Sequence, residues 1–244
     1  MKLEGKVALV TGAGSNLGKI YAAALAKEGA AVVIGDIDGD LARAAAQEIA
    51  ETGAKTLGLE MDMGNEAHIE SAVETTIAEF GGVDILVNNA GLARGRWNLC
   101  SELTNEEWRL ILWINVAAPL ALARACRPSM VARGGGVIIN QSSKAAYSNM
   151  ESAYGVSKLA MSGLTVALAQ EFGPDNIRVN GIAPGMMNGR VPPEIIERAL
   201  SRQSLKRRGT PEDLAGTLIY LATDASSFMS GQTLIVDGGS TQRP

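Results

Sequence analysis

The chain has 244 residues, of which 46% are hydrophobic and 20% are charged, and its formal net charge is −4. This composition is typical of a soluble globular protein with a sizeable core, and the lack of a basic excess argues against nucleic-acid binding. The two cysteines lack metal-ligand spacing, the start lacks the apolar run of a signal peptide, and the apolar runs are short, so we expect a cytoplasmic protein with no metal and no membrane partner.

Short β-branched runs alternate with alanine-rich amphipathic segments in the first part of the chain, which is typical of a parallel sheet covered by helices. The near-continuous apolar runs Val7-Ala-Leu-Val10 and Val32-Val-Ile34 suit strands that are buried on both faces. Strands are predicted over residues 6–11, 31–36, 55–61 and 83–87, and helices over residues 17–29, 41–52 and 66–80.

The pattern continues without a linker or an internal repeat, so we expect one α/β domain over residues 1–244. The remaining helices are predicted over residues 105–131, around Tyr154, and from Thr210-Pro-Glu-Asp-Leu onward, and the remaining strands over residues 136–141, 177–181 and 232–236. Glycine, proline and charged residues break the periodicity over residues 186–208. We interpret this segment as a substrate loop, either a mobile flap over a site or a plain surface excursion.

A glycine-rich turn, Thr11-Gly-Ala-Gly-Ser-Asn-Leu-Gly18, joins the first predicted strand to the first predicted helix. A helix amino terminus offers unpaired N–H groups and a positive dipole to a pyrophosphate, and small residues let the phosphate approach the backbone. Asp36 ends the second strand, where a carboxylate accepts hydrogen bonds from a ribose 2′-OH. The carboxylate would repel a 2′-phosphate, and no nearby arginine offsets it, so the sequence favours NAD over NADP.

Asp62 follows the third strand, where it would either hydrogen-bond an adenine or cap the next helix. His68, the only histidine, lies at what we expect to be an exposed helix start, which argues against a Ser-His-Asp hydrolase. We expect the nucleotide-binding residues of this half of the chain to be Gly12, Ser15, Asn16, Leu17, Gly18, Asp36, Ile37, Asp62 and Met63.

Tyr154 and Lys158 lie four residues apart in a predicted helix, so both side chains project from one face. A phenol ordinarily loses its proton only near pH 10, and a neighbouring ammonium group stabilises the phenolate. A tyrosine in this setting suits proton transfer near neutral pH, although such a pair taken alone is more often a solvated one.

The order of motifs along the whole chain resembles that of the classical short-chain dehydrogenases/reductases. The resemblance rests on the glycine-rich turn, Asn88-Asn-Ala-Gly91, Ser143, Tyr154-x-x-x-Lys158 and Asp237-Gly-Gly. It implies a Rossmann-type sheet of seven strands in the order 3-2-1-4-5-6-7 and an NAD(P)-dependent interconversion of alcohol and carbonyl. It also implies a homotetramer, in which the long helices near Asn115 and Tyr154 pair between subunits.

The resemblance assigns roles to residues that match the family motifs. Tyr154 would be the general acid or base, Ser143 would hydrogen-bond the substrate oxygen, and Lys158 would hold the nicotinamide ribose and favour the phenolate. Asn115 would anchor a water that passes protons to Lys158. A polar side chain inside an otherwise apolar helix seldom lacks a hydrogen-bond partner. Further cofactor contacts are expected from Asn89, Ala90, Gly91, Tyr154, Lys158, Pro184, Gly185 and Met187.

The chain departs from the family pattern in three places. Asn16 stands where the family usually has a glycine, and asparagine tolerates left-handed backbone better than most residues. Only ten residues, 144–153, separate Ser143 from Tyr154. This loop is shorter than usual, which leaves Ser142 as an alternative catalytic serine. The run Met186-Met-Asn-Gly189 replaces the usual isoleucine and threonine beside the nicotinamide.

The substrate pocket is expected to have an aromatic and methionine lining, which suits a substrate with an apolar body. Its predicted residues are Arg94, Trp97, Lys144, Tyr147, Met150 and Met186. The cations would meet an acidic substrate, but loop cations are usually only solvated, so such a substrate is the less favoured alternative.

We therefore expect an NAD-dependent dehydrogenase of a secondary alcohol. One alternative is an NADPH-dependent reductase of the 3-oxoacyl carrier-protein type, against which Asp36 and the acidic charge balance count. The other is a nucleotide-binding protein that no longer turns over.

Overall fold

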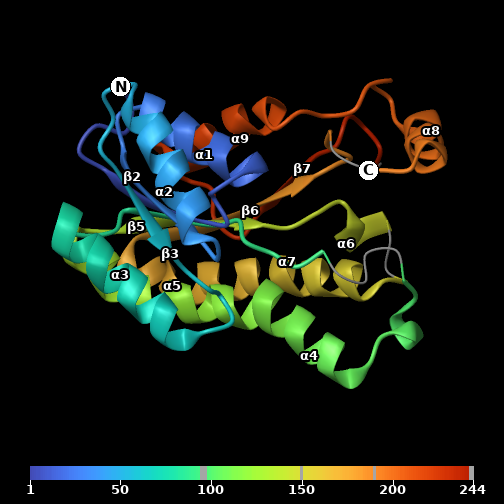
Figure 1. The fold of residues 1–244 in the computed structure, drawn as a ribbon, viewed down its shortest axis with the longest axis horizontal. Coiled ribbons are helices and arrows are strands. Elements are labelled where there is room, and N and C mark those ends of the chain that lie inside the picture. The colour runs from blue at the N-terminus through green and yellow to red at the C-terminus, as the bar shows by residue number, and fades with distance from the viewer. Residues whose placement is uncertain (94–97, 149–150, 189–190, 242–244) are drawn as a thin grey trace.

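A seven-stranded parallel sheet forms the centre of the computed structural model, which describes residues 1–93, 98–148, 151–188 and 191–241. The strand order, β3-β2-β1-β4-β5-β6-β7, confirms the expected Rossmann-type topology (Figure 1). The strands are β1 (Val7–Thr11), β2 (Ala31–Asp36), β3 (Thr56–Glu60), β4 (Ile85–Asn88), β5 (Gly136–Gln141), β6 (Ile177–Pro184) and β7 (Thr233–Val236).

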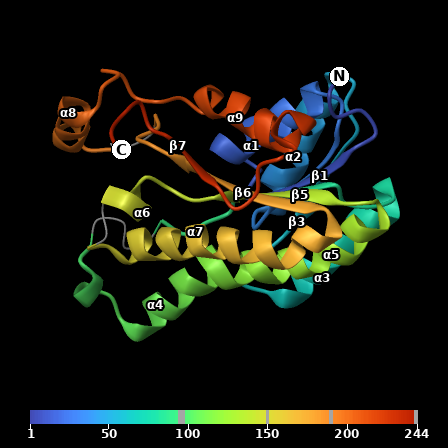
Figure 2. The same ribbon diagram turned by 180° about the vertical axis from the view of Figure 1, so that it is seen from behind.

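Helices cover both faces of the sheet, as a parallel sheet requires (Figures 1 and 2). One layer contains α1 (Asn16–Lys27), α2 (Gly39–Ala50) and α9 (Glu212–Ala222), and the other contains α3 (Glu66–Phe80), α5 (Ala118–Ala132) and α7 (Ala153–Phe172). Alternate residues of a strand pack against opposite helix layers. Val10 packs toward the first layer, and the neighbouring Leu9 toward the second.

The long helix expected over residues 105–131 is interrupted by a π-helical turn. It consists of α4 (Asn105–Leu112), the turn Trp113–Ala117 and α5. By length and composition alone, Asn105–Ala132 would suffice to cross a membrane, with a mean hydropathy of 1.4 over an 18-residue window that is 39% buried. The expectation that the apolar runs are too short to cross a bilayer was therefore wrong for this helix. Core helices of soluble proteins pass the same test, and Leu122 and Met130 of this one are fully buried against the sheet.

Two helices lie where the sequence predicted no regular structure. The short α6 (Ala145–Ser148) occupies the loop after β5, and α8 (Pro193–Arg202) occupies the middle of the proposed substrate loop. The interpretation of residues 193–202 as irregular was wrong, because the prolines that precede α8 begin a helix as readily as they break one. Ile195, Ile196, Ala199 and Leu200 then repeat at helical spacing.

The carboxyl ends of the parallel strands meet at one edge of the sheet. The glycine-rich turn follows β1, Asp36 ends β2, Asn89 follows β4, Ser143 follows β5 and Gly185 follows β6. In open α/β sheets this edge is where ligands bind. The fold therefore gathers most of the predicted site residues from distant parts of the sequence.

Candidate active site

The glycine-rich turn has the backbone that its sequence predicts. Gly12 has φ +60° and Asn16 has φ +48°, so both lie in the left-handed region, and Asn16 there confirms the expected tolerance. Ser15, at the amino end of α1, makes no side-chain capping bond, although Asp38 caps α2 and Ser152 caps α7 in this way. Within the described residues, no side chain accepts a hydrogen bond from the first N–H groups of α1, which fits a pyrophosphate.

Asn89 holds the turn in place from the neighbouring strand. Its Nδ2 donates to the carbonyl oxygens of Thr11 and Gly12, both at 2.9 Å. A Cβ at Gly18 would lie 2.2 Å from the oxygen of Gly12 and 2.6 Å from Asn89 Nδ2, and a Cβ at Gly12 would lie 2.9 Å from Ala90 Cα. Only glycine fits either position, so the two loops form one surface against which a dinucleotide can lie.

Asp36 faces the glycine-rich turn from the end of β2. Its Oδ2 accepts a hydrogen bond from Gly14 N at 2.9 Å, and its Oδ1 accepts one from Asp38 N at 3.1 Å. A carboxylate has lone pairs left for further donors. Among the described residues, no lysine or arginine forms an ion pair with Asp36, and the adjacent Ile37 is 68% exposed.

Asp62 and Met63 lie on the same edge, after β3. Asn65, not Asp62, caps α3 through Oδ1, so the interpretation of Asp62 as the cap was wrong. The Oδ1 of Asp62 accepts from Gly64 N at 2.7 Å, and the Asp62 N–H donates to Nδ1 of the half-buried His68 at 3.3 Å. Met63 is buried, and its carbonyl accepts from Trp113 Nε1 at 3.1 Å.

The π-helical turn places the fully buried Asn115 between three segments. Its Oδ1 accepts from Leu92 N at 2.7 Å, and its Nδ2 donates to Leu92 O at 3.0 Å and to Ser157 Oγ at 2.9 Å. Asn115 therefore joins the loop after β4 to α7. Single π turns of this kind are frequent at functional sites.

Lys158 is buried in α7, with its charged end at the base of the site. Its Nζ donates to the carbonyl of Gln141, at the end of β5, at 2.8 Å. Burial lowers the pKa of Lys158 from 10.5 to about 8. The Nζ lies 5.8 Å from the centroid of the Tyr154 ring and would lie 3.1 Å from a Cβ at Gly91. The pair predicted from the sequence is thus in contact range, beside the Asn-Ala-Gly loop.

Tyr21 supports this arrangement from α1, and sequence patterns gave no sign of it. Its hydroxyl, which is fully buried, donates to Gln141 Oε1 at 3.0 Å. Burial raises the pKa of Tyr21, so its hydroxyl keeps its proton and remains a donor. Gln141, whose backbone carbonyl binds Lys158, is thereby hydrogen-bonded to α1.

The two neighbouring serines point to different partners. Ser142 Oγ donates to the carbonyl of Lys158 at 2.9 Å and also lies 2.9 Å from Ser162 Oγ, so it binds α7. Ser143 Oγ accepts from Ala145 N at 3.2 Å and lines an open cleft of about 420 Å³. A hydroxyl in the cleft can meet a substrate oxygen, which favours Ser143 over Ser142 as the serine of the site.

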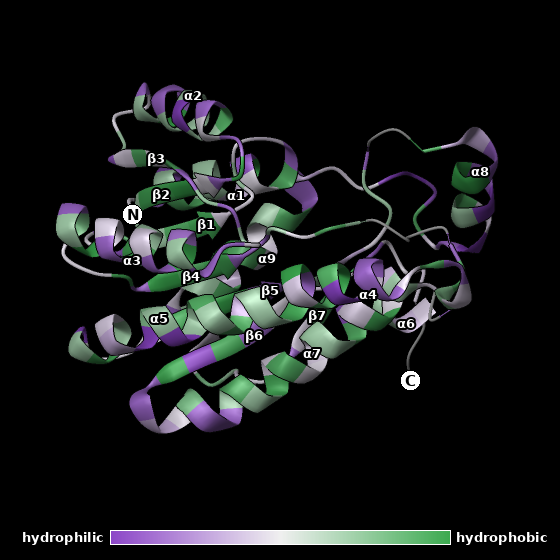
Figure 3. Cartoon of the chain, turned by 60° about the horizontal axis from the view of Figure 1, so that its bottom comes forward, coloured by the Kyte–Doolittle hydropathy of each residue, from purple (hydrophilic) through white to green (hydrophobic). Residues whose placement is uncertain are grey.

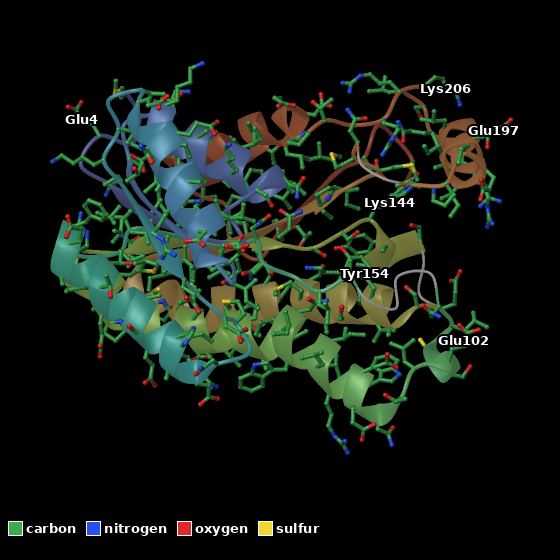
Figure 4. All side chains as sticks on the ribbon, in the orientation of Figure 1. Glu4, Glu102, Lys144, Tyr154, Glu197 and Lys206 are labelled. Carbon is green, nitrogen blue, oxygen red and sulfur yellow. The ribbon has the colours of Figure 1, made fainter. Side chains whose placement is uncertain are left out.

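This cleft contains part of the predicted substrate pocket. Lys144 and Met186 line it, whereas Tyr147 does not, because its hydroxyl donates to Ser162 Oγ at 3.0 Å. Figure 4 shows Lys144 and Tyr154 at the same end of the molecule, between the layers that carry α8 and α4. The other predicted pocket residues, Arg94, Trp97 and Met150, lie outside the described residues.

One wall of the cleft comes from α8, which the sequence did not predict. Ile195, Arg198, Ala199 and Arg202 of this helix line it. Their spacing of three and four residues is typical of one face of a helix. This spacing was the sequence signal that could have predicted α8.

The segment after β6 is fixed by backbone hydrogen bonds. Pro184 O accepts from Lys144 N at 2.9 Å, and Gly185 N donates to Val236 O at 2.9 Å. A Cβ at Gly185 would lie 2.6 Å from Asp237 Cα, which explains the glycine. Met187 pairs with Gly209 in an isolated parallel β-bridge, and its carbonyl accepts a hydrogen bond from Arg208 Nη2 at 2.6 Å. This carbonyl is thus already bonded within the protein.

Known proteins resemble this chain along nearly its whole length. A family model described as Enoyl-(Acyl carrier protein) reductase matches residues 12–241. The chain is 37% identical to the 7alpha-hydroxysteroid dehydrogenase of Escherichia coli K12, covering 99% of this chain and 96% of the relative. It is 35% identical to the 3-oxoacyl-[acyl-carrier-protein] reductase FabG of Thermotoga maritima, covering 98% of this chain and 99% of the relative.

Solved structures show the same similarity in three dimensions. The fold matches that of a 7 alpha-hydroxysteroid dehydrogenase complexed with NADH and 7-oxo glycochenodeoxycholic acid, with a TM-score of 0.93 and 36% identity. The match covers 99% of this chain and 96% of that one.

Proposed function

Since the chain belongs to the short-chain dehydrogenase/reductase family of oxidoreductases, we propose that it interconverts a secondary alcohol and a ketone with NAD(H). The observation that carries this proposal is the buried ammonium group of Lys158, held by the Gln141 carbonyl beside the Tyr154 ring. Burying a charged lysine lowers the stability of the fold unless the ammonium group is paired or hydrogen-bonded. Here the charge lies where it would stabilise a tyrosine phenolate.

The residues at the carboxyl edge of the sheet fit a dinucleotide. The amino end of α1 would hold the pyrophosphate, Asp36 the adenosine ribose, and Lys158 the nicotinamide ribose. Asn89, Ala90, Gly91 and the segment 184–187 would complete the site. When bound, the nicotinamide supplies hydride transfer to or from the carbon of the substrate.

The preference for NAD over NADP rests on Asp36. A 2′-phosphate placed at the ribose would meet this carboxylate, and no described cation is paired with Asp36 to offset the repulsion. The solved relative bound to NADH agrees with a nicotinamide cofactor. Titration of the protein with NADH and NADPH, followed by nucleotide fluorescence, tests this part of the proposal. Tighter binding of NADPH would contradict it.

In the oxidation direction, Tyr154 would accept the proton of the substrate hydroxyl as hydride leaves the adjoining carbon. Ser143 Oγ would hydrogen-bond the same oxygen and fix its position, and the ammonium of Lys158 would stabilise the phenolate. In the reduction direction, Tyr154 would donate its proton to the carbonyl oxygen. One acid or base and one fixed hydrogen-bonding group suffice for either direction.

Proton exchange with solvent would pass from Tyr154 toward Lys158 and Asn115. The pKa of Lys158, lowered to about 8 by burial, lets this group exchange a proton near neutral pH. The hydrogen bonds of Asn115 to Leu92 and Ser157 hold it beside the loop that contacts Lys158. A water held there would complete the path.

A screen of cyclic secondary alcohols and hydroxy acids with NAD and NADP, followed by absorbance of the reduced nicotinamide, tests the proposed reaction. The proposal expects turnover with NAD for at least one chemical class, and turnover at least about 100-fold slower with the Tyr154→Phe variant. A second candidate, reduction of 3-oxoacyl carrier-protein thioesters, is favoured by the similarity to the Thermotoga maritima reductase. Faster turnover of such thioesters with NADPH than of any alcohol with NAD would favour this second candidate.

We also propose a cytoplasmic homotetramer. Figure 3 shows α5 and α7 on the face turned toward the viewer, with apolar residues along much of both helices. Leu159 and Val166 are seven residues apart on α7 and are 41% and 46% exposed, so they form an apolar stripe. Sedimentation velocity is expected to give a tetramer for the natural chain and smaller species for Leu159→Glu/Val166→Glu. A monomeric natural chain at micromolar concentration would reject this assembly.

A further inference from the structure

The cleft that Ser143 lines carries an excess of positive charge. Its charged lining residues are Lys144, Arg198, Arg202 and Glu151, which are three cations and one carboxylate, whereas the whole chain has a formal net charge of −4. A local excess of cations in an acidic protein attracts anionic ligands to that place. This excess favours an anionic ligand at the cleft.

Arg198 and Arg202 lie four residues apart on α8, so their side chains share one helix face. Glu194 precedes Arg198 by four residues, a spacing at which helical ion pairs commonly form. Nevertheless, within the described parts of the chain, no ion pair or side-chain hydrogen bond involves either guanidinium group. Both arginines are exposed and line the cleft.

Glu197, one of the two acidic residues of α8, does not neutralise this face. Glu197 lines a separate groove on the other side of the helix, together with Ile196 and Leu200. Figure 4 shows Glu197 on the outer side of α8, away from Lys144. The helix thus places Arg198 and Arg202 toward the cleft and Glu197 away from it.

The interior of the cleft is chemically different from its mouth. Met186 and Ser143 are each 6% exposed and lie at its base, while the exposed arginines lie at its rim. Ile195 and Ala199 add apolar surface between them. A ligand that fills the cleft would place its reacting oxygen at Ser143, an apolar body along Met186 and Ile195, and its far end among the cations.

We propose that the substrate is a secondary alcohol or ketone with an apolar body and a terminal anionic group, a carboxylate or a phosphate ester, bound by Arg198 and Arg202. Guanidinium groups bind both anions through paired N–H donors. The Nζ of Lys144 donates to Ser240 Oγ at 2.7 Å and adds charge from the opposite wall. This inference rests on the proposed function, because it takes Ser143 as the place of the reacting oxygen.

The test compares cyclic keto acids with their neutral counterparts. The probes are oxocyclohexanecarboxylate and oxodecalincarboxylate, the primary amide of each, and the phosphate ester of hydroxycyclohexanone. The proteins are the natural chain, Arg198→Ala/Arg202→Ala, and Lys27→Ala/Lys55→Ala. The last variant removes the same charge from two exposed lysines at the opposite edge of the sheet.

We expect the natural chain to favour acid over amide by about tenfold in kcat/KM with NADH, and the arginine variant to reduce this preference to about twofold or less. The lysine variant should keep the preference. Comparison of the carboxylate and phosphate probes identifies which anion fits better. Equal use of acid and amide by the natural chain would overturn the proposal, as would an equal loss for both in the arginine variant.

Binding to the NAD-loaded protein, which cannot reduce the keto probes, is measured by calorimetry and separates this inference from the proposed reaction. Tighter binding of acid than of amide, lost in the arginine variant, would support the anion subsite even without turnover, and the reaction would then be the part that failed. Turnover without any preference for the acid, in rate or binding, would leave the reaction standing and reject the subsite. An absence of both preferential binding and turnover would reject the subsite.

Discussion

Replacement of Lys158 by methionine should abolish turnover without lowering stability near neutral pH. Burial lowers the pKa of Lys158 from 10.5 to about 8, and each pKa unit corresponds to about 1.4 kcal/mol. Keeping the ammonium charged in the folded protein near pH 7 therefore costs about 3 kcal/mol. Methionine has a similar length and no charge, so it removes this cost.

The loss of the hydrogen bond from Nζ to the Gln141 carbonyl works in the opposite direction. A buried carbonyl without a donor costs about 1–3 kcal/mol. The net expectation for Lys158→Met is thus a gain of about 0–2 kcal/mol in the free energy of unfolding near pH 7.

The pH dependence of the unfolding free energy separates the effect of the lysine charge from the effect of the lost hydrogen bond. Because the folded pKa of Lys158 lies below the unfolded one, the unfolded chain binds more protons between about pH 8 and pH 10.5, and stability rises with pH over that range. Near pH 9.5 the cost of the buried lysine falls to about 1 kcal/mol. The natural chain should therefore gain about 2 kcal/mol relative to Lys158→Met between about pH 7 and pH 9.5.

Urea unfolding at both pH values and one protein concentration, followed by circular dichroism, measures this difference. Lys27→Met provides the control, because it removes an exposed lysine in place of the buried one. A Lys158→Met variant that is less stable by more than about 1 kcal/mol near pH 7, with no change in the difference at higher pH, would refute the assigned cost of burial.

Three other substitutions test individual contacts. Ser143→Ala should lower kcat by about 100-fold through loss of the group that binds the substrate oxygen, whereas Ser142→Ala should mainly lower stability; the reverse result would make Ser142 the catalytic serine. Tyr21→Phe should cost about 1–3 kcal/mol in unfolding free energy and lower kcat with little change in NADH affinity, and an unchanged stability and kcat would remove its positioning role. Asp36→Asn should narrow the preference for NADH over NADPH by about tenfold in Kd ratio, and a constant ratio would show that Asp36 does not read the ribose.

The sequence predicted most of the fold because its strongest signals are local. The apolar runs of the inner strands and the left-handed position at Asn16 depend on few distant contacts. The helix α8 was missed because Pro192 and Pro193 interrupt the periodicity at its start, although prolines there also begin a helix. The order of the strands came from the family resemblance and not from periodicity.

The candidate site was predictable where a motif fixes both residue and position, and less so where tertiary contacts decide the direction of a side chain. Tyr147 was expected in the pocket, but a hydrogen bond to Ser162 on a later helix turns its hydroxyl away from the cleft. Asp62 and Asn65 are equally suitable helix caps by residue type, and the backbone of the turn selects Asn65. The positions of Tyr21 and Arg198 depend on how layers pack, which no local pattern contains.

The most direct measurement of the central claim is hydride transfer by Tyr154→Phe in a single turnover with a secondary alcohol that the natural chain oxidises. The Tyr220→Phe variant, which alters a 41% exposed tyrosine on α9, is the matched control. We predict that Tyr154→Phe binds NAD as the natural chain does but transfers hydride at least about 100-fold more slowly, while Tyr220→Phe is unaffected. Hydride transfer by Tyr154→Phe at a rate within about threefold of the natural chain would contradict its role as general acid and base.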